Sequence, residues 1–97
     1  MILDKNIALE TATFLLQINA IKLNSKKPFK WASGWRSPIY CDNRLALSFP
    51  KVRTFIVNEI ANQVRSLYGA KISIAGVATG AIGVGALVAN QLNAPFL

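Results

Sequence analysis

The run from Ile72 to Leu92, ISIAGVATGAIGVGALVANQL, contains no charged residue and constrains the fold more than any other stretch of the chain. It opens with β-branched residues, reaches glycine at Gly76, and becomes apolar on nearly every side beyond Gly80. This order predicts a buried strand, a glycine-rich turn over residues 76–80, and an apolar helix. The start of such a helix presents free backbone N–H groups, to which phosphate can bind.

The glycine spacing does not match either of two specific phosphate loops. The Walker pattern needs Lys and Ser or Thr after its second glycine, whereas Gly85 is followed by Ala86 and Leu87. The dinucleotide pattern G-x-G-x-x-G is also absent. Two interpretations stay open: a cradle of backbone amides in which Thr79 supplies the one hydroxyl, or glycines that allow a helix to pack closely on a strand.

Length and charge limit the alternatives. The chain has 97 residues, is 53% hydrophobic, and carries a net charge of +7 from eleven bases and four acids. Most of the bases precede Val57, so this basic region could meet nucleic acid, an anionic membrane or a phosphorylated small molecule. One cysteine and no histidine exclude an internal disulfide and the usual zinc sites. No secretory signal is visible at the start, so we expect a cytoplasmic protein.

Local signals predict the remaining elements. Asp4 is placed to cap a helix that runs to about Ile21. A second helix begins at Ser48 and Pro50, repeats its apolar residues at intervals of three and four, and ends at Gly69. Its cations are expected on the solvent face: Lys51, Arg53 and Arg65. After the apolar helix Asn93 is a possible cap, and residues 94–97 begin another strand, which opens a βαβ unit without finishing it.

The stretch from Phe29 to Arg44, FKWASGWRSPIYCDNR, predicts a hairpin-like flap. Its two extended segments are Phe29–Ala32 and Pro38–Cys41, with a hinge at Ser33 and Gly34. Aromatic rings beside cations can stack a planar ligand and hold its carboxylate or a phosphate. Equally, the rings can cap a small core while the cations point to solvent, and the residues alone do not decide between the two.

Three stretches of the chain resemble the orotate phosphoribosyltransferase family of type I phosphoribosyltransferases. They are the flap, the following Leu47, Ser48, Phe49, Pro50 and Lys51, and the later GVATGAIGVGALVA. Most of this resemblance rests on three short motifs of the flap: Trp-Ala-Ser-Gly, Ser-Pro-Ile-Tyr and Asp-Asn-Arg. It implies an α/β protein, namely the N-terminal part of a type I phosphoribosyltransferase fold. Residues 1–45 would form the N-terminal helix and the substrate-side flap, or hood. Residues 46–97 would form the first part of a parallel-sheet core, incomplete at its C-terminus.

The resemblance also implies an activity. Members transfer phosphoribosyl from phosphoribosyl pyrophosphate to orotate with Mg²⁺, giving orotidine monophosphate and pyrophosphate in the synthesis of pyrimidines and UMP, and they work as homodimers. Tyr40 and Cys41 fall at the orotate-contacting positions. Ala78, Thr79 and Gly80 fall in the loop that binds pyrophosphate. The resemblance assigns no catalytic residue and no metal ligand to these 97 residues, so the chain alone is expected to be inactive.

Two other functions compete with this enzyme. A membrane-associated fragment is suggested by the uncharged stretch from Ile72 to Leu97 and by the small-xxx-small pair Gly76 and Gly80, but its polar side chains argue against it. A module for single-stranded nucleic acid is suggested by Trp31, Trp35 and Tyr40 among cations. We expect the enzyme, with neither nucleic acid nor membrane as partner.

Overall fold

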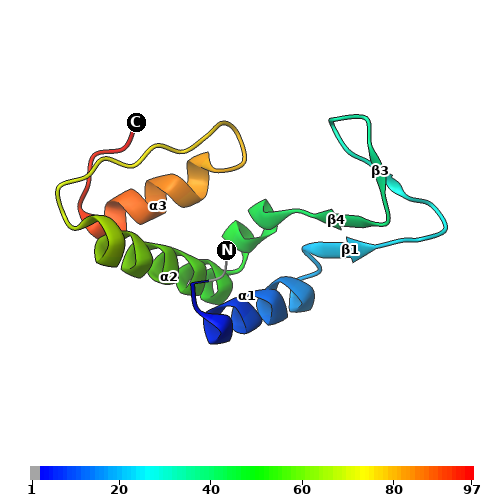
Figure 1. Cartoon of the computed structure of the whole chain (residues 1–97), viewed down its shortest axis with the longest axis horizontal. Helices are drawn as coiled ribbons and strands as arrows, with labels where there is room; N and C mark the ends of the chain where they lie inside the picture. Colours follow the sequence, from blue (N-terminus) through cyan, green and yellow to red (C-terminus); the bar gives the residue numbers. More distant parts are fainter. Residues whose placement is uncertain (1–2) are drawn as a thin grey trace. The chain divides into compact units, whose positions relative to one another are not determined.

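The computed structural model describes residues 3–97. The chain divides into two units, Met1–Leu45 and Ala46–Leu97. Figure 1 follows them in chain order from α1 to the C-terminus.

Helix α1 spans Lys5–Gln17 and opens the first unit. The Asp4 carboxylate accepts hydrogen bonds from the backbone N–H groups of Asn6 at 2.8 Å and Ile7 at 3.1 Å, which confirms the predicted cap. The predicted end at Ile21 is wrong. Asn19 adopts the left-handed conformation with φ of 58°, which turns the chain out of the helix before Ile21.

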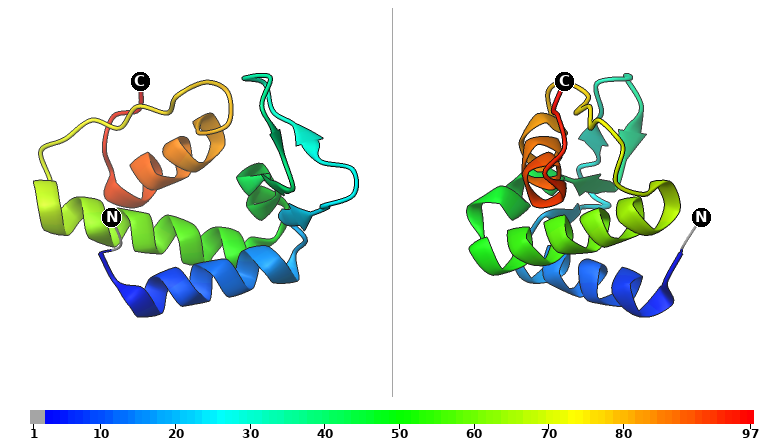
Figure 2. Two further views of the ribbon diagram at one scale, coloured as in Figure 1. Left: turned by 45° about the vertical axis from the view of Figure 1, so that its right-hand side comes forward. Right: turned by 90° about the vertical axis from the view of Figure 1, so that its left-hand side faces the viewer.

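Two short antiparallel sheets follow α1. Strand β1, Ile21–Leu23, pairs with β4, Ile39–Cys41, so that Lys22 lies opposite Tyr40. Strand β2, Phe29–Lys30, pairs with β3, Arg36–Ser37, and Figure 2 shows the hairpin that they form. The turn falls at the predicted Ser33 and Gly34, with φ of 90° at Gly34.

The predicted pairing within the flap is therefore partly wrong. The segment from residue 38 to 41 belongs to the β1 sheet and does not pair with the segment that begins at Phe29. The cause is β1 itself: the first helix was predicted to run to about Ile21, where β1 begins, and no strand was predicted there to pair with β4.

The second unit begins in the 3₁₀ helix η1, Asn43–Ser48, and continues into α2, Pro50–Tyr68. Pro50 opens the helix and Gly69, with φ of 77°, ends it, as predicted. Ser48 lies in η1, and the capping residue Phe49 contributes no side-chain hydrogen bond. Arg53, expected to face solvent, donates from Nη1 to the Leu47 carbonyl at 2.8 Å and so ties α2 to η1.

Helix α3 spans Ile82–Leu92 and ends at Asn93, which has φ of 53°, as the sequence predicts. The two predicted strands of the parallel sheet are reduced to a single parallel bridge between Ile74 and Phe96. The Ile74 N–H donates to the Pro95 carbonyl, and the Leu97 N–H donates to the Ile74 carbonyl, both at 2.9 Å. A parallel sheet needs further neighbouring strands, and the described residues of this unit supply one bridge only.

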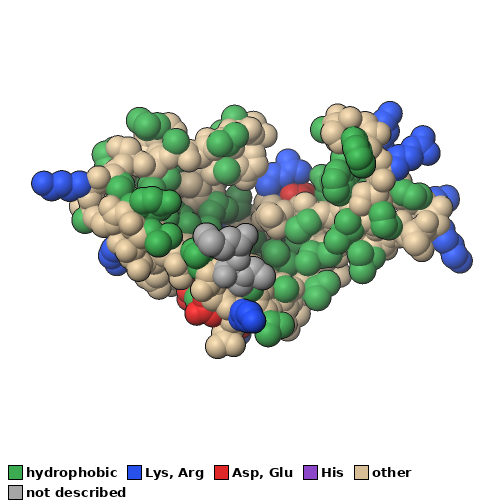
Figure 3. Space-filling view, in the orientation of Figure 1, with side chains coloured by type: hydrophobic (Ala, Val, Ile, Leu, Met, Phe, Trp, Pro, Cys, Tyr) green, Lys and Arg blue, Asp and Glu red, His purple; other side chains and the backbone are tan. Residues whose placement is uncertain are grey.

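The core of the second unit lies between α2 and α3, which run side by side in Figures 1 and 2. Val57, Ala61 and Val88 are buried there, and Ile74 packs against them. Across residues 3–97, every buried residue is an alanine or a valine: Ala20, Ala46, Val52, Val57, Ala61, Val88 and Ala89. Many larger hydrophobic side chains are exposed, among them Leu23, Trp35 and Tyr68, and Figure 3 shows hydrophobic side chains in green over much of the surface.

Candidate functional site

The glycine loop between Ile74 and α3 presents a row of backbone donors. Ala78, Thr79 and Gly80 are exposed, and the peptide bond between Ala78 and Thr79 is cis. Within residues 3–97, the N–H groups of these three residues donate to no protein acceptor. The loop is held instead by Ala81, whose N–H donates to the Val77 carbonyl at 3.1 Å. Free N–H groups beside the positive end of an eleven-residue helix favour an anion.

The glycines of this segment serve two different purposes. A Cβ added at Gly76 would lie 2.7 Å from the Ala81 carbonyl oxygen, and one added at Gly85 would lie 3.1 Å from Cε1 of Phe96. These two glycines therefore let the strand end, the helix and Phe96 pack closely together. Gly80 has no atom within 4 Å of such a Cβ, and its φ is not positive. Close packing thus explains Gly76 and Gly85, whereas Gly80 leaves open space beside the free donors.

A pocket of about 320 Å³ lies between α2, α3 and residues 73–76. Its wall is formed mainly by apolar side chains such as Ile60, Val64 and Val88 and contains no charged residue. A phosphate group would lose its hydration there without gaining a partner, so the pocket belongs to the open core of the unit. The candidate anion site is the exposed loop.

In the first unit, β4 carries Tyr40 and Cys41. The half-buried Tyr40 ring lies 5.8 Å from the Phe29 ring, at an interplanar angle of 40°. The exposed Cys41 thiol donates to Oδ1 of Asn43 at 3.0 Å. Because neighbouring side chains on a strand point to opposite faces, the ring and the thiol do not converge on one ligand. The two residues can act together only through the strand backbone.

One residue of β4 has backbone N–H and C=O groups that make no hydrogen bond to the described residues. The Asp42 N–H donates to the Ala20 carbonyl at 2.8 Å, and the Asn24 N–H donates to the Pro38 carbonyl at 2.7 Å. In an antiparallel pair this alternation turns the backbone groups of Tyr40 toward β1 and those of Ile39 and Cys41 away from it.

Side chains of the hairpin cover Ile39 but not Cys41. The Ile39 N–H donates to Oγ of Ser37 at 3.2 Å, and the Ile39 carbonyl accepts from the Trp31 indole N–H at 3.1 Å. The outward N–H and carbonyl of Cys41 have no hydrogen-bond partner within residues 3–97. Cys41 is thus the open edge of β4, where a planar polar ligand could pair with the strand.

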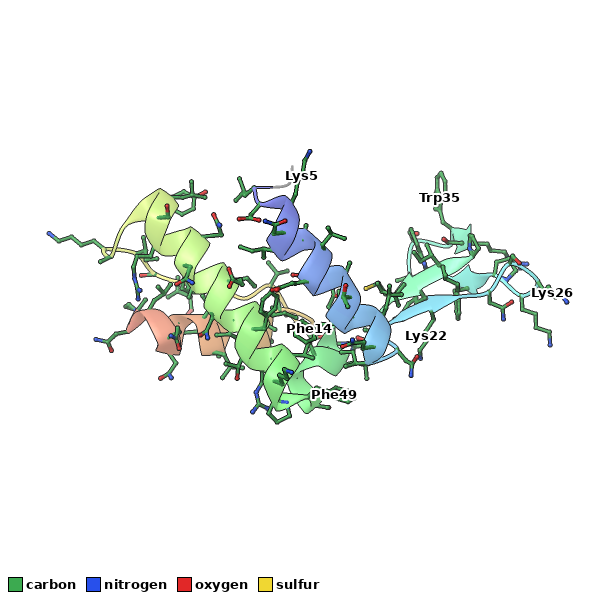
Figure 4. The ribbon with its side chains drawn as sticks, turned by 90° about the horizontal axis from the view of Figure 1, so that it is seen from below. Lys5, Phe14, Lys22, Lys26, Trp35 and Phe49 are labelled. Atoms are coloured by element: carbon green, nitrogen blue, oxygen red, sulfur yellow. The ribbon has the colours of Figure 1, made fainter. Side chains whose placement is uncertain are left out.

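The surroundings of β4 are positively charged. Asp42 accepts from Nε of Arg44 at 2.9 Å and from Nη2 at 3.1 Å, and these hydrogen bonds lower the pKa of Asp42 below its ordinary 3.8 and raise the pKa of Arg44. Lys22 lies opposite Tyr40, while Lys30 and Arg36 face each other on the hairpin. Figure 4 shows Lys22, Lys26 and Trp35 extending from this part of the unit. The field favours an anionic ligand.

The predicted site residues fall on two units. Tyr40 and Cys41 are adjacent in the first, and Ala78, Thr79 and Gly80 form one continuous loop in the second. Sequence reasoning missed the contact of Trp31 with Ile39, because it depends on a strand pairing that no periodicity reveals, and it did not consider the local hydrogen bond of Ser37 with Ile39.

Comparisons with known proteins find similarity to orotate phosphoribosyltransferases. No protein-family model matches the chain. It is 55% identical over 93 residues to the orotate phosphoribosyltransferase of Bacteroides fragilis and 58% identical over 83 residues to that of Phocaeicola vulgatus. The first alignment covers 96% of this chain and 44% of the relative, and the second covers 86% and 39%. The chain thus spans less than half the length of these relatives.

A solved structure shares the fold. The crystal structure of orotate phosphoribosyltransferase from Aeropyrum pernix matches with a TM-score of 0.72 at 28% identity. The match covers 89% of this chain and 50% of that one.

Proposed function

We propose, on the premise that this chain belongs to the orotate phosphoribosyltransferase family, that the protein transfers phosphoribosyl from phosphoribosyl pyrophosphate to orotate. The product would be orotidine monophosphate, a precursor of UMP. The observation that carries the proposal is the 55% identity over 96% of the chain, because that span includes both β4 and the glycine loop.

The glycine loop supports a role in binding pyrophosphate. Its three free N–H groups at Ala78, Thr79 and Gly80 can hydrogen-bond phosphate oxygens, and the Thr79 hydroxyl adds one side-chain donor. Donors that are fixed before the reaction stabilise the charge that grows on a departing pyrophosphate. The open space beside Gly80 lets an anion approach the backbone closely.

The open edge of β4 supports a role in binding orotate. The ligand carries amide-like N–H and C=O groups and a carboxylate, and Cys41 offers one backbone donor and one backbone acceptor. The Tyr40 ring and the surrounding cations would add apolar contact and a favourable field. In this proposal the Cys41 thiol is not needed.

We propose that Mg²⁺ takes part as an ion bound to the phosphates of the substrate. No group of three or more His, Cys, Asp or Glu side chains within residues 3–97 could hold a metal. Mg²⁺ commonly binds substrate phosphates with few protein ligands, so these residues would meet the ion through phosphoribosyl pyrophosphate. From the family resemblance we also propose that the protein works as a homodimer in the cytoplasm.

The alternatives gain no support. No helix within residues 3–97 is long and apolar enough to cross a membrane. The relatives described above are phosphoribosyltransferases, and none of these comparisons favours the nucleic-acid module.

The test is an assay of orotate consumption with phosphoribosyl pyrophosphate and Mg²⁺. We expect turnover from a chain extended to the length of the relatives and none from the 97-residue chain. A folded, extended chain that leaves orotate unchanged would refute the proposal. In the active chain, Tyr40→Ala should raise the orotate KM. Gly80→Val should weaken the binding of phosphoribosyl pyrophosphate more than Thr79→Val does, because only Gly80→Val obstructs the backbone donors.

A further inference from the structure

The β2–β3 hairpin reaches the candidate orotate strand through three side chains. Phe29 contacts the Tyr40 ring, Ser37 accepts from the Ile39 N–H, and the Trp31 indole N–H donates to the Ile39 carbonyl. All three contacts meet β4 immediately before Cys41. The two hydrogen bonds to Ile39 lie on the edge of the strand that β1 leaves unpaired.

We infer that Trp31 is a positioning residue for orotate binding, which acts by holding Ile39 so that the open backbone edge at Cys41 is correctly placed. This inference rests on the proposed function. The bond from the Trp31 indole to the Ile39 carbonyl measures 3.1 Å, a full hydrogen bond between groups eight residues apart. A turn clamps the backbone of Trp31 itself, since its N–H donates to the Trp35 carbonyl at 2.8 Å and its carbonyl accepts from the Gly34 N–H at 2.9 Å.

Because Trp31 is partly exposed, removing its indole N–H should affect the position of β4 without unfolding the protein. The residue is 42% exposed, and Ile39 is 41% exposed, so water can reach the Ile39 carbonyl when the indole donor is removed. The fold should then survive, because no buried polar group is left without a partner. What disappears is the link that fixes the outward face of β4 relative to the hairpin.

Trp35 offers a matched control. It lies on the same hairpin and is 75% exposed, and Figure 4 shows it extending from the tip. Within residues 3–97, no acceptor for its indole N–H is found. Trp35→Phe therefore makes the same chemical change as Trp31→Phe without removing a contact to β4.

The test compares Trp31→Phe, Trp35→Phe and Ser37→Ala in the chain extended to the length of the relatives, with KM measured separately for orotate and for phosphoribosyl pyrophosphate. We expect Trp31→Phe to raise the orotate KM about two- to tenfold, the effect of losing one neutral hydrogen bond, and Ser37→Ala to change it in the same direction. Neither variant should change the KM for phosphoribosyl pyrophosphate, and Trp35→Phe should change neither constant.

Several results would overturn the inference. An orotate KM unchanged in Trp31→Phe would do so, as would an equal change in Trp35→Phe or a parallel rise in both KM values. If Trp31→Phe did not fold, Ser37→Ala would decide alone, and an unchanged orotate KM there would refute positioning through Ile39. Inactivity of the unsubstituted extended chain would refute the proposed function instead, so the two failures are distinguishable.

Discussion

The glycines around the loop predict a graded response to the same small substitution. Gly76→Ala places a Cβ 2.7 Å from the Ala81 carbonyl oxygen and 3.1 Å from the Ile82 Cα, both backbone atoms at the start of α3. Such atoms can move only if the loop and the helix shift together. We therefore expect Gly76→Ala to cost about 1 to 3 kcal/mol, the usual range for overpacking. For a chain of this size that lowers Tm by about 5 to 20 °C.

Alanine substitutions at two nearby glycines provide comparisons for this expected loss of stability. Gly80→Ala meets no atom within 4 Å and needs no positive φ, so its effect on unfolding should stay within about 0.5 kcal/mol. Gly83→Ala meets Cδ1 of Leu47 at 2.8 Å, but this is the end of a flexible side chain that can rotate away. A gain in helix propensity of about 0.5 to 1 kcal/mol should offset that adjustment.

Thermal unfolding followed by far-ultraviolet circular dichroism measures the series on the 97-residue chain. The expected order of Tm is Gly80→Ala close to the unsubstituted chain, Gly83→Ala near it, and Gly76→Ala well below both. If Gly76→Ala unfolded at the same temperature as Gly80→Ala, the close packing of the strand end against α3 would be refuted. In the extended chain, Gly80→Ala should instead weaken binding of phosphoribosyl pyrophosphate, because a methyl group stands where the anion approaches.

Other perturbations test separate parts of the molecule. Asp4→Ala should destabilise α1 by about 1 kcal/mol and Asp4→Asn far less, because Asn keeps the capping oxygen; helicity and Tm report both changes. Because Arg44 lowers the pKa of Asp42, their pairing should be fully present above pH 3.8 and be lost as the pH falls through the lowered pKa, and an NMR titration midpoint at or above 3.8 would contradict this. The 97-residue chain should self-associate through exposed apolar side chains such as Val77, at 78%, and Leu97, at 79%, whereas light scattering from a monomer at all concentrations would argue against it.

The helices could be predicted because their signals are local. Asp4 lies beside the N–H groups that it caps, Pro50 opens α2, and Gly69 and Asn93 supply the positive φ at which α2 and α3 end. Each signal acts within one helical turn of its own position. No knowledge of the tertiary structure is required to interpret it.

The strands could not be predicted to the same extent, because their partners are distant in the sequence. Strand β1 is three residues long, too short to show an alternating pattern, and its partner β4 begins sixteen residues after it ends. The segment around Ile74 has the β-branched composition of a buried strand but forms one bridge, since a parallel strand depends on neighbours that its own residues do not specify.

The two candidate sites were difficult to assign from residue types for a related reason: each of them offers the backbone. The loop from Ala78 to Gly80 presents N–H groups, and β4 presents the outward edge of Cys41. Each site is fixed by residues that would not touch a ligand, Gly76 and Gly85 for the loop and Trp31 for the strand. For a chain with four acids and no histidine, we therefore propose that peptide groups supply the donors for polar, anionic ligands and that other residues fix where those groups point.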